Sequence, residues 1–365
     1  MSFSRSKLID PQNSNYVELV INEFIGKLST HKFIKEVREK IGSKKEELEL
    51  KFLYSSLSRR KEVGINVLIK FLKNEEFKTY DFNTLNLSDN LITLESLSLI
   101  LGYLKENPFI TKLNLSHNSL GIVNSRLKLY PQIFDYFSVN TTLKVLDLSL
   151  NEIEFRDYSI DDEFDDEFDE ELDDEFYDEF DEKLDEYPNK KKGYKYIIDI
   201  MNAIKSNPNC AIEEINLSFN GIKKEGIYSI SKMLETNKSL KKLDLSHNKL
   251  MDSLEILGNS LLMNYTIESL NISYGSFSNE NFISFLSIIK NNYSLQEIYY
   301  NYYYCDNKTI KTEKINTICE RNKKLVKSKG KMMNFMLAVQ KQETKKRIFP
   351  VELFDLIFSE YILTF

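Results

Sequence analysis

Few side chains in this sequence have the types and spacing that catalysis or metal binding requires. Histidine and cysteine are the side chains that most often act as metal ligands or activated nucleophiles. The 365-residue chain has three of each, and all six are scattered: His31, His117, His247, Cys210, Cys305 and Cys319. No CxxC, GxxxxGK[ST], GxSxG or HExxH pattern occurs. We therefore expect no enzyme activity, no cofactor and no metal site, and the unpaired cysteines favour a reducing compartment.

Carboxylates are concentrated in one tract, residues 161–186, which reads DDEFDDEFDEELDDEFYDEFDEKLDE. It holds 18 Asp or Glu residues, with Phe or Leu at every fourth position. On a straight helix that apolar row would wrap about 200° around the axis, and dense like charge opposes helix formation. We expect a mostly disordered, low-complexity insertion, with a functional acidic-aromatic segment as the alternative. The tract also hides an excess of basic residues elsewhere, onto which it could fold back.

Internal repeats determine the expected fold. Six segments share the pattern LxLSxN or a close variant, and a degenerate seventh follows: 85–90, 113–118, 146–151, 215–220, 243–248, 270–275 and 298–303. A helical pattern follows most copies. The two apolar residues of each copy would point inward from a short strand, and the Asn amide can bond backbone groups that the following turn leaves unpaired. A structural role is therefore predicted for the terminal asparagines: Asn90, Asn118, Asn151, Asn220 and Asn248.

This pattern resembles the leucine-rich repeat, specifically the ribonuclease-inhibitor-like subtype with repeats of about 28 residues. The resemblance implies an α/β solenoid, a horseshoe or arc with a concave parallel sheet and convex helices. Residues 79–325 would form the repeats. The long step between the third and fourth copies places the acidic insertion at about 152–193, on a rim loop. Residues 1–78 read as a helical N-terminal cap, with helices expected at 17–28, 31–42, 44–57 and 62–74.

A binding face is expected on the concave side, because side chains alternate along a strand. The residue before each terminal Asn becomes aromatic toward the C-terminal end, and tyrosine is favoured at protein interfaces. An alternative for the last, tyrosine-rich strand is that it packs its own tyrosines against the end of the array. The candidate partner-binding residues are Asp89, His117, Asp147, Phe219, Asp244, His247, Tyr274, Tyr299 and Tyr302.

The C-terminal segment, 326–365, contains a strongly apolar amphipathic helical pattern at 347–363. The run Phe349-Pro350-Val351-Glu352 resembles the start of an F-box, the domain that docks a Skp-type adaptor of a ubiquitin ligase. The candidate adaptor-binding residues are Pro350, Leu353, Phe354, Ile357 and Phe358. The alternative is a capping helix that packs on the last repeat.

The expected function is a non-enzymatic protein–protein interaction scaffold, with ubiquitin-ligase substrate recruitment as a sharper version. The alternative is a regulator of a small GTPase, because the Ran GTPase-activating protein resembles this chain in repeat subtype. No nucleic-acid-binding motif accompanies the lysines, and no apolar run is long enough to cross a membrane. We therefore expect a protein partner, no nucleic acid and no membrane. The expected location is the cytoplasm, or the host cytosol if the source is an intracellular bacterium or virus.

Overall fold

A computed structural model describes residues 16–20, 48–53, 68–69, 73, 82–90, 92–121, 131–151, 194–301 and 312–328. The acidic tract, Tyr302 and the candidate adaptor-binding residues lie outside these ranges. None of the described helices is long and apolar enough to cross a membrane.

One parallel sheet runs through the molecule, and its nine strands are ordered as they occur in the chain. They are β1 (Tyr16–Val20), β2 (Leu48–Leu53), β3 (Phe82–Asn86), β4 (Lys112–Asn114), β5 (Val145–Asp147), β6 (Glu214–Asn216), β7 (Lys242–Asp244), β8 (Ser269–Asn271) and β9 (Glu297–Tyr299). From β3 onward one buried Leu or Ile of each strand is in register with that of the next, beginning with Leu85, Leu113 and Leu146. The 69-residue step between β5 and β6 keeps this register, because Leu146 pairs with Ile215.

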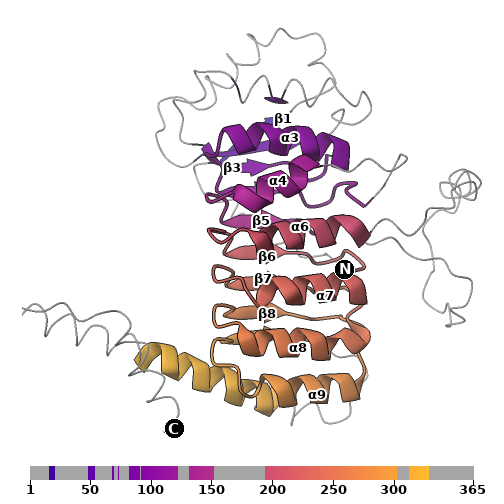
Figure 1. Ribbon diagram of the computed structural model, residues 1–365, viewed down its shortest axis with the longest axis vertical. Helices are drawn as coiled ribbons and strands as arrows, with labels where there is room; N and C mark the ends of the chain where they lie inside the picture. Colours follow the sequence, from indigo (N-terminus) through magenta and orange to yellow (C-terminus); the bar gives the residue numbers. More distant parts are fainter. Residues whose placement is uncertain are drawn as a thin grey trace, which may run out of the picture.

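Helices alternate with the strands from β3 to β9 and form a single row along the sheet (Figure 1). They are α3 (Leu94–Glu106), α4 (Pro131–Val139), α6 (Tyr194–Ser206), α7 (Lys224–Leu234), α8 (Leu254–Met263) and α9 (Asn279–Ile289). A short 3-10 helix, η5 (Met251–Ser253), precedes α8. A final helix, residues 312–328, follows the last repeat. Each helix contacts the next one in the row, so one face of the sheet is covered. We call the opposite face of the sheet the open face.

The expected helical cap at 1–78 is wrong at two places. Residues 17–20 and 48–53 were expected inside helices, but both lie in strands that extend the sheet. Val17 pairs with Leu50, and Leu50 pairs with Leu85. The segment LELKFL alternates apolar and polar residues, which is a strand pattern. Its parallel pairing with β3 gives hydrogen-bond partners to backbone groups that would otherwise form an open sheet edge. Leu68 and Ile69, within the helix expected at 62–74, are helical.

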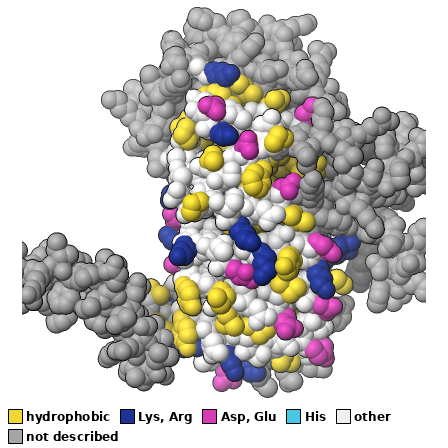
Figure 2. All heavy atoms as spheres, in the orientation of Figure 1, with side chains coloured by type: hydrophobic (Ala, Val, Ile, Leu, Met, Phe, Trp, Pro, Cys, Tyr) yellow, Lys and Arg dark blue, Asp and Glu magenta, His cyan; other side chains and the backbone are white. Residues whose placement is uncertain are grey.

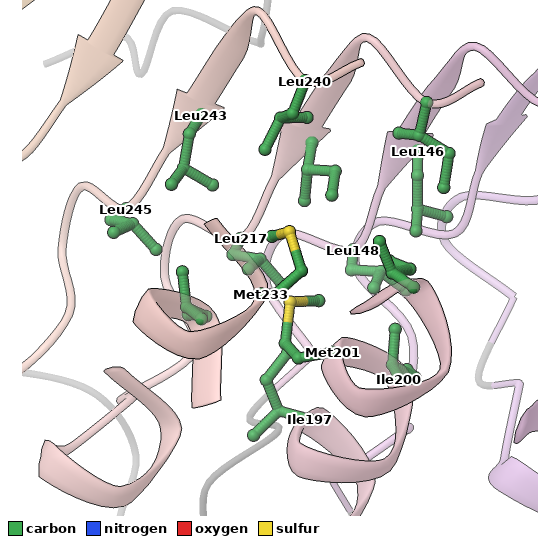
Figure 3. Packing of buried hydrophobic residues seen from close by; sticks show 14 of the residues in the cluster. Leu146, Leu148, Ile197, Ile200, Met201, Leu217, Met233, Leu240, Leu243 and Leu245 are labelled. Atoms are coloured by element: carbon green, nitrogen blue, oxygen red, sulfur yellow. The ribbon is translucent and has the colours of Figure 1, made fainter. Parts of the chain in front are cut away.

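The core lies between the sheet and the row of helices. Strand residues such as Leu146 and Leu243 point toward helix residues such as Ile197, Met201 and Met233, and all five are buried (Figure 3). Burying a Leu, Ile or Met side chain contributes about 1.5–3 kcal/mol, so each repeat adds to the same continuous core.

An asparagine ladder joins the turns that follow the strands. Asn118 Oδ1 accepts hydrogen bonds from the N–H groups of Asn90 (3.0 Å) and Ile92 (2.9 Å) in the preceding repeat. Its Nδ2 donates to Leu87 O and Leu115 O, both at 2.9 Å. The structural role predicted for these residues is confirmed, because each member links two repeats in a similar way: Asn118, Asn151, Asn220 and Asn248.

A second asparagine ladder lies at the opposite rim, where each helix returns to the next strand. Asn264 Oδ1 accepts from the N–H groups of Thr266 and Ile267, both at 2.9 Å. Its Nδ2 donates to Leu234 O (2.8 Å) and Asn237 O (3.1 Å) of the preceding repeat. The motif N-x-[ST]-[LI] marks several of its positions in the sequence, although we did not predict a ladder from it. Its members are Asn140, Asn207, Asn237, Asn264, Asn292 and Asn322.

Candidate protein-binding face

One residue in each of six repeats adopts a left-handed backbone conformation at the carboxyl end of its strand. These residues directly precede the positions of the first ladder and have φ between 53° and 60°: Asp89, His117, Leu150, Phe219, His247 and Tyr274. We call this set the left-handed row. None is Gly, although this conformation costs a residue with a Cβ atom roughly 1–2 kcal/mol. Leu150 and Phe219 are 45% and 37% exposed, respectively. The turn therefore places large side chains at the surface.

Three members of the left-handed row form an aromatic column. The rings of Phe219 and His247 stack with centroids 3.7 Å apart and planes 12° apart. The rings of His247 and Tyr274 stack at 4.2 Å and 19°. The Tyr274 hydroxyl accepts a hydrogen bond from Asn301 Nδ2 at 2.6 Å. Adjacent strands are about 4.8 Å apart, so equivalent positions in neighbouring repeats bring planar side chains to stacking distance.

The two histidines of the left-handed row differ in their surroundings. His117 Nδ1 hydrogen-bonds the carboxylate of Asp89, and both side chains are well exposed. Burial lowers the pKa of His247, and the nearby Asp244 carboxylate opposes that shift only in part. His247 is therefore neutral over a wider pH range than an ordinary histidine.

Asp147 and Asp244, which we predicted to contact a partner, are held in place by hydrogen bonds at the strand ends; Asp147 is buried and Asp244 is half-buried. Asp147 Oδ1 accepts from both the N–H and the hydroxyl of Ser149, and Oδ2 accepts from Asn216 Nδ2. Asp244 makes the same bonds with Ser246 and Asn271. Burial raises the pKa of Asp147. These hydrogen bonds give both carboxylates a role in fixing the strand ends.

A charge ladder crosses the open face where the strands begin. Glu213 Oε1 lies 3.1 Å from Lys144 Nζ, and its Oε2 lies 2.7 Å from Lys241 Nζ. Lys242 Nζ lies 2.8 Å from Glu214 Oε1. Hydrogen bonds from Lys241 and Lys144 lower the pKa of Glu213. Sequence reasoning missed this ladder, although charges of opposite sign at one repeat position were its signal.

The structure thus groups the predicted contact residues into two sets. Phe219, His247 and Tyr274 stand together in the aromatic column, and Tyr299 on β9 is 52% exposed in the next repeat. Asp89 and His117 form a pair at the other end of the left-handed row.

The described part of the chain contains few side chains placed for metal binding or nucleophilic chemistry. No group of three or more His, Cys, Asp or Glu side chains that could hold a metal ion occurs there. Cys319 is buried, and burial raises the pKa of its thiol.

On the side shown in Figure 2, acidic and basic side chains are interspersed with apolar ones.

Comparison with known families agrees with this geometry. A family model described as "Leucine Rich repeat" matches residues 106–121, 139–154, 209–231 and 236–253. The chain contains leucine-rich repeats. Leucine-rich-repeat proteins generally serve as protein-interaction scaffolds. The ribonuclease-inhibitor-like subtype stays a prediction.

Several solved structures are similar to the chain, at low sequence identity. LegL7, a leucine-rich repeat-containing protein from Legionella pneumophila, is 16% identical, with a TM-score of 0.34 over 84% of this chain and 98% of that one. Leiomodin-1 actin-binding site 2 is 17% identical, with a TM-score of 0.33 over 41% and 82% of the two chains. The tropomodulin C-terminal domain of Caenorhabditis elegans is 19% identical, with a TM-score of 0.32 over 37% and 79%. No curated protein matches the chain in sequence.

Proposed function

We propose that this protein is a non-enzymatic scaffold that binds a protein partner through the open face of its repeats. The observation that carries the proposal is the aromatic column of Phe219, His247 and Tyr274. Aromatic side chains that are already ordered lose little conformational entropy on binding, which is why they dominate interface energies. The left-handed backbone supports the same conclusion, because it holds bulky side chains at the surface at a cost in stability.

The test is a cross-linking experiment with the full chain followed by mass spectrometry. A captured partner should cross-link to β6–β9, and Phe219→Ala should weaken its binding by about tenfold or more, since truncating a hot-spot residue costs about 2 kcal/mol or more. Tyr228→Ala is the matched control, because Tyr228 is an aromatic residue on α7 that is 52% exposed. Cross-links confined to the helices, or equal effects of the two variants, would contradict the proposal.

A ubiquitin-ligase version of this function rests on the sequence of residues 350–358. If the segment acts like an F-box, a Skp-type adaptor should co-purify with the full chain, and the double substitution Leu353→Asp with Phe354→Asp should abolish the interaction. Failure of the unmodified chain to bind the adaptor would dismiss this version and leave the scaffold proposal intact. The GTPase-regulator alternative has only repeat resemblance behind it, and a shared fold does not transfer an activity.

A further inference from the structure

The C-terminal half of the open face carries an excess of negative charge. On β6–β9 and the residues just before these strands, five carboxylates accompany two ammonium groups: Glu213, Glu214, Asp244, Glu268, Glu297, Lys241 and Lys242. Both lysines are already paired, with Glu213 and Glu214. Glu268 and Glu297 are exposed, and within the described ranges no Lys or Arg lies at ion-pair distance from either. Both carboxylates thus lie at the surface without an ion pair to any described residue, although the charge of Lys323 on the final helix also reaches Tyr299 beside Glu297.

The surplus of carboxylates raises the pKa values of the two lysines of this region. The pKa of Lys242 is raised, first by its hydrogen bond to Glu214 and also by the charges of Glu214, Glu297 and Glu268. The pKa of Lys241 is raised in the same way, first by Glu213. The Tyr299 hydroxyl donates to Glu297 Oε2 at 3.0 Å, which places a half-exposed aromatic ring beside an exposed carboxylate.

The glutamates lie where the strands begin and the aromatic column lies where they end, so both border the same open face. Asp244 and His247 occupy one strand and its following turn, and the charge of Asp244 acts on the His247 ring. An aromatic surface beside carboxylates favours cations, because ring faces attract ammonium and guanidinium groups and carboxylates pair with them. Polyanions such as nucleic acids would be repelled by the same field.

We propose that the surface formed by Glu268, Glu297, Tyr299 and the aromatic column binds a Lys/Arg-rich segment of a protein partner. This inference rests on the proposed scaffold function and specifies its partner. Arginine and lysine of the partner pair with Glu268 and Glu297 and lie over the exposed ring of Tyr299. The acidic tract of this chain has the wrong sign to occupy this face.

The test uses the full chain and two short photoreactive peptides, one of alternating Arg and Ser and one of alternating Glu and Ser. The Arg peptide should cross-link to residues of β6–β9, and its affinity should fall with rising salt. Glu268→Lys combined with Glu297→Lys should weaken this binding by about three- to tenfold, as expected for exposed charges that change sign. Glu106→Lys combined with Glu255→Lys is the matched control, since it reverses two exposed charges on α3 and α8.

Three results would overturn the inference: cross-links confined to residues 152–193, equal effects of the two double variants, or equal binding of the Glu peptide. A natural partner that depends on Phe219 but ignores Glu268→Lys and Glu297→Lys would also reject it. That last result would leave the scaffold function standing, so the two proposals can fail separately.

Discussion

The asparagine side chains of the first ladder supply hydrogen bonds to backbone N–H and C=O groups in the turn that follows each short strand. Asn248 is an example. Its Oδ1 accepts from the N–H groups of Asn220 and Ile222, and its Nδ2 donates to Leu217 O and Leu245 O. The residue is 2% exposed, so water cannot replace these bonds.

Asn248→Ala should therefore destabilise the fold more than an ordinary surface change. Several buried backbone groups would lose their partner, and we expect a loss of about 2–4 kcal/mol in the free energy of unfolding, measured by urea denaturation. Lys249→Ala, at the adjacent exposed position, should change stability by less than about 0.5 kcal/mol. Similar values for both variants would argue against a structural ladder.

The left-handed row makes a second prediction at the residue scale. Leu150 has a φ of 56° and is exposed, so its backbone is strained while its side chain packs little. Leu150→Gly should be more stable than Leu150→Ala by roughly 0.5–1 kcal/mol, because only Gly adopts this conformation without a steric cost. Thermal unfolding of the pair measures this difference. The opposite order, which is usual within helices and strands, would contradict the assigned backbone conformation.

At the scale of elements, strands β3–β9 and their helices were predictable because apolar spacing and the terminal Asn recur together. Strands β1 and β2 were not predicted, since both lack the LxLSxN signature and the short alternation in β2 lies among residues with helical spacing. The row that we propose as part of the binding face was also visible in the sequence. Its left-handed backbone and the stacking of Phe219 on His247 were not, because neither φ nor ring geometry leaves a periodic signal. Asp147 looked like a surface residue because its burial and its hydrogen bond from Asn216 depend on the neighbouring strand.

The helix at 312–328 carries the last residue of the second ladder, Asn322. Arg321 Nη1 donates to Lys290 O at 2.6 Å, Nη2 donates to Asn292 O, and the guanidinium lies 4.5 Å from the centre of the Tyr293 ring. Asn322 is fully buried, and its Nδ2 donates to Leu295 O at 2.7 Å. Carbonyls at the C-terminal end of α9 and in the loop that follows it thus obtain their partners from the final helix.

Arg321→Ala should loosen the C-terminal repeat without unfolding the rest. We expect a loss of about 1.5–3 kcal/mol in the free energy of unfolding, the usual range for hydrogen bonds to a charged group. Hydrogen exchange should accelerate in α9 and β9 and stay unchanged in α3, because repeats contact only their neighbours. Lys324→Ala, on the exposed side of the same helix, is the control. Uniform acceleration along the whole chain would contradict this picture.

At the scale of the molecule, charge is distributed differently from what the composition suggests. The described residues contain 20 Lys or Arg and 20 Asp or Glu, so the repeats themselves are close to neutral. The basic excess expected for the body lies outside them. The insertion between β5 and β6 leaves the strand register intact, because Val145, Leu146 and Asp147 pair with Glu214, Ile215 and Asn216.

Deleting residues 161–186 should therefore leave the fold unchanged. Far-ultraviolet circular dichroism and the thermal midpoint should match those of the full chain within experimental error, since β5 and β6 pair directly in register on either side of the insertion. Replacing the same residues by a Gly/Ser linker of equal length is the control for loop length. A midpoint lower than in both references would show that the tract contributes to folding.

The left-handed row contributes one side chain per repeat, so the composition of the open face can be changed by substitution in one repeat at a time. The ladder asparagine that follows each of these residues holds the turn. A substitution at Leu150 or Phe219 therefore changes the exposed side chain and leaves the backbone of the turn in place. The row consists of Asp89, His117, Leu150, Phe219, His247 and Tyr274. Under the proposed function, a different set of side chains on the same backbone would bind a different partner.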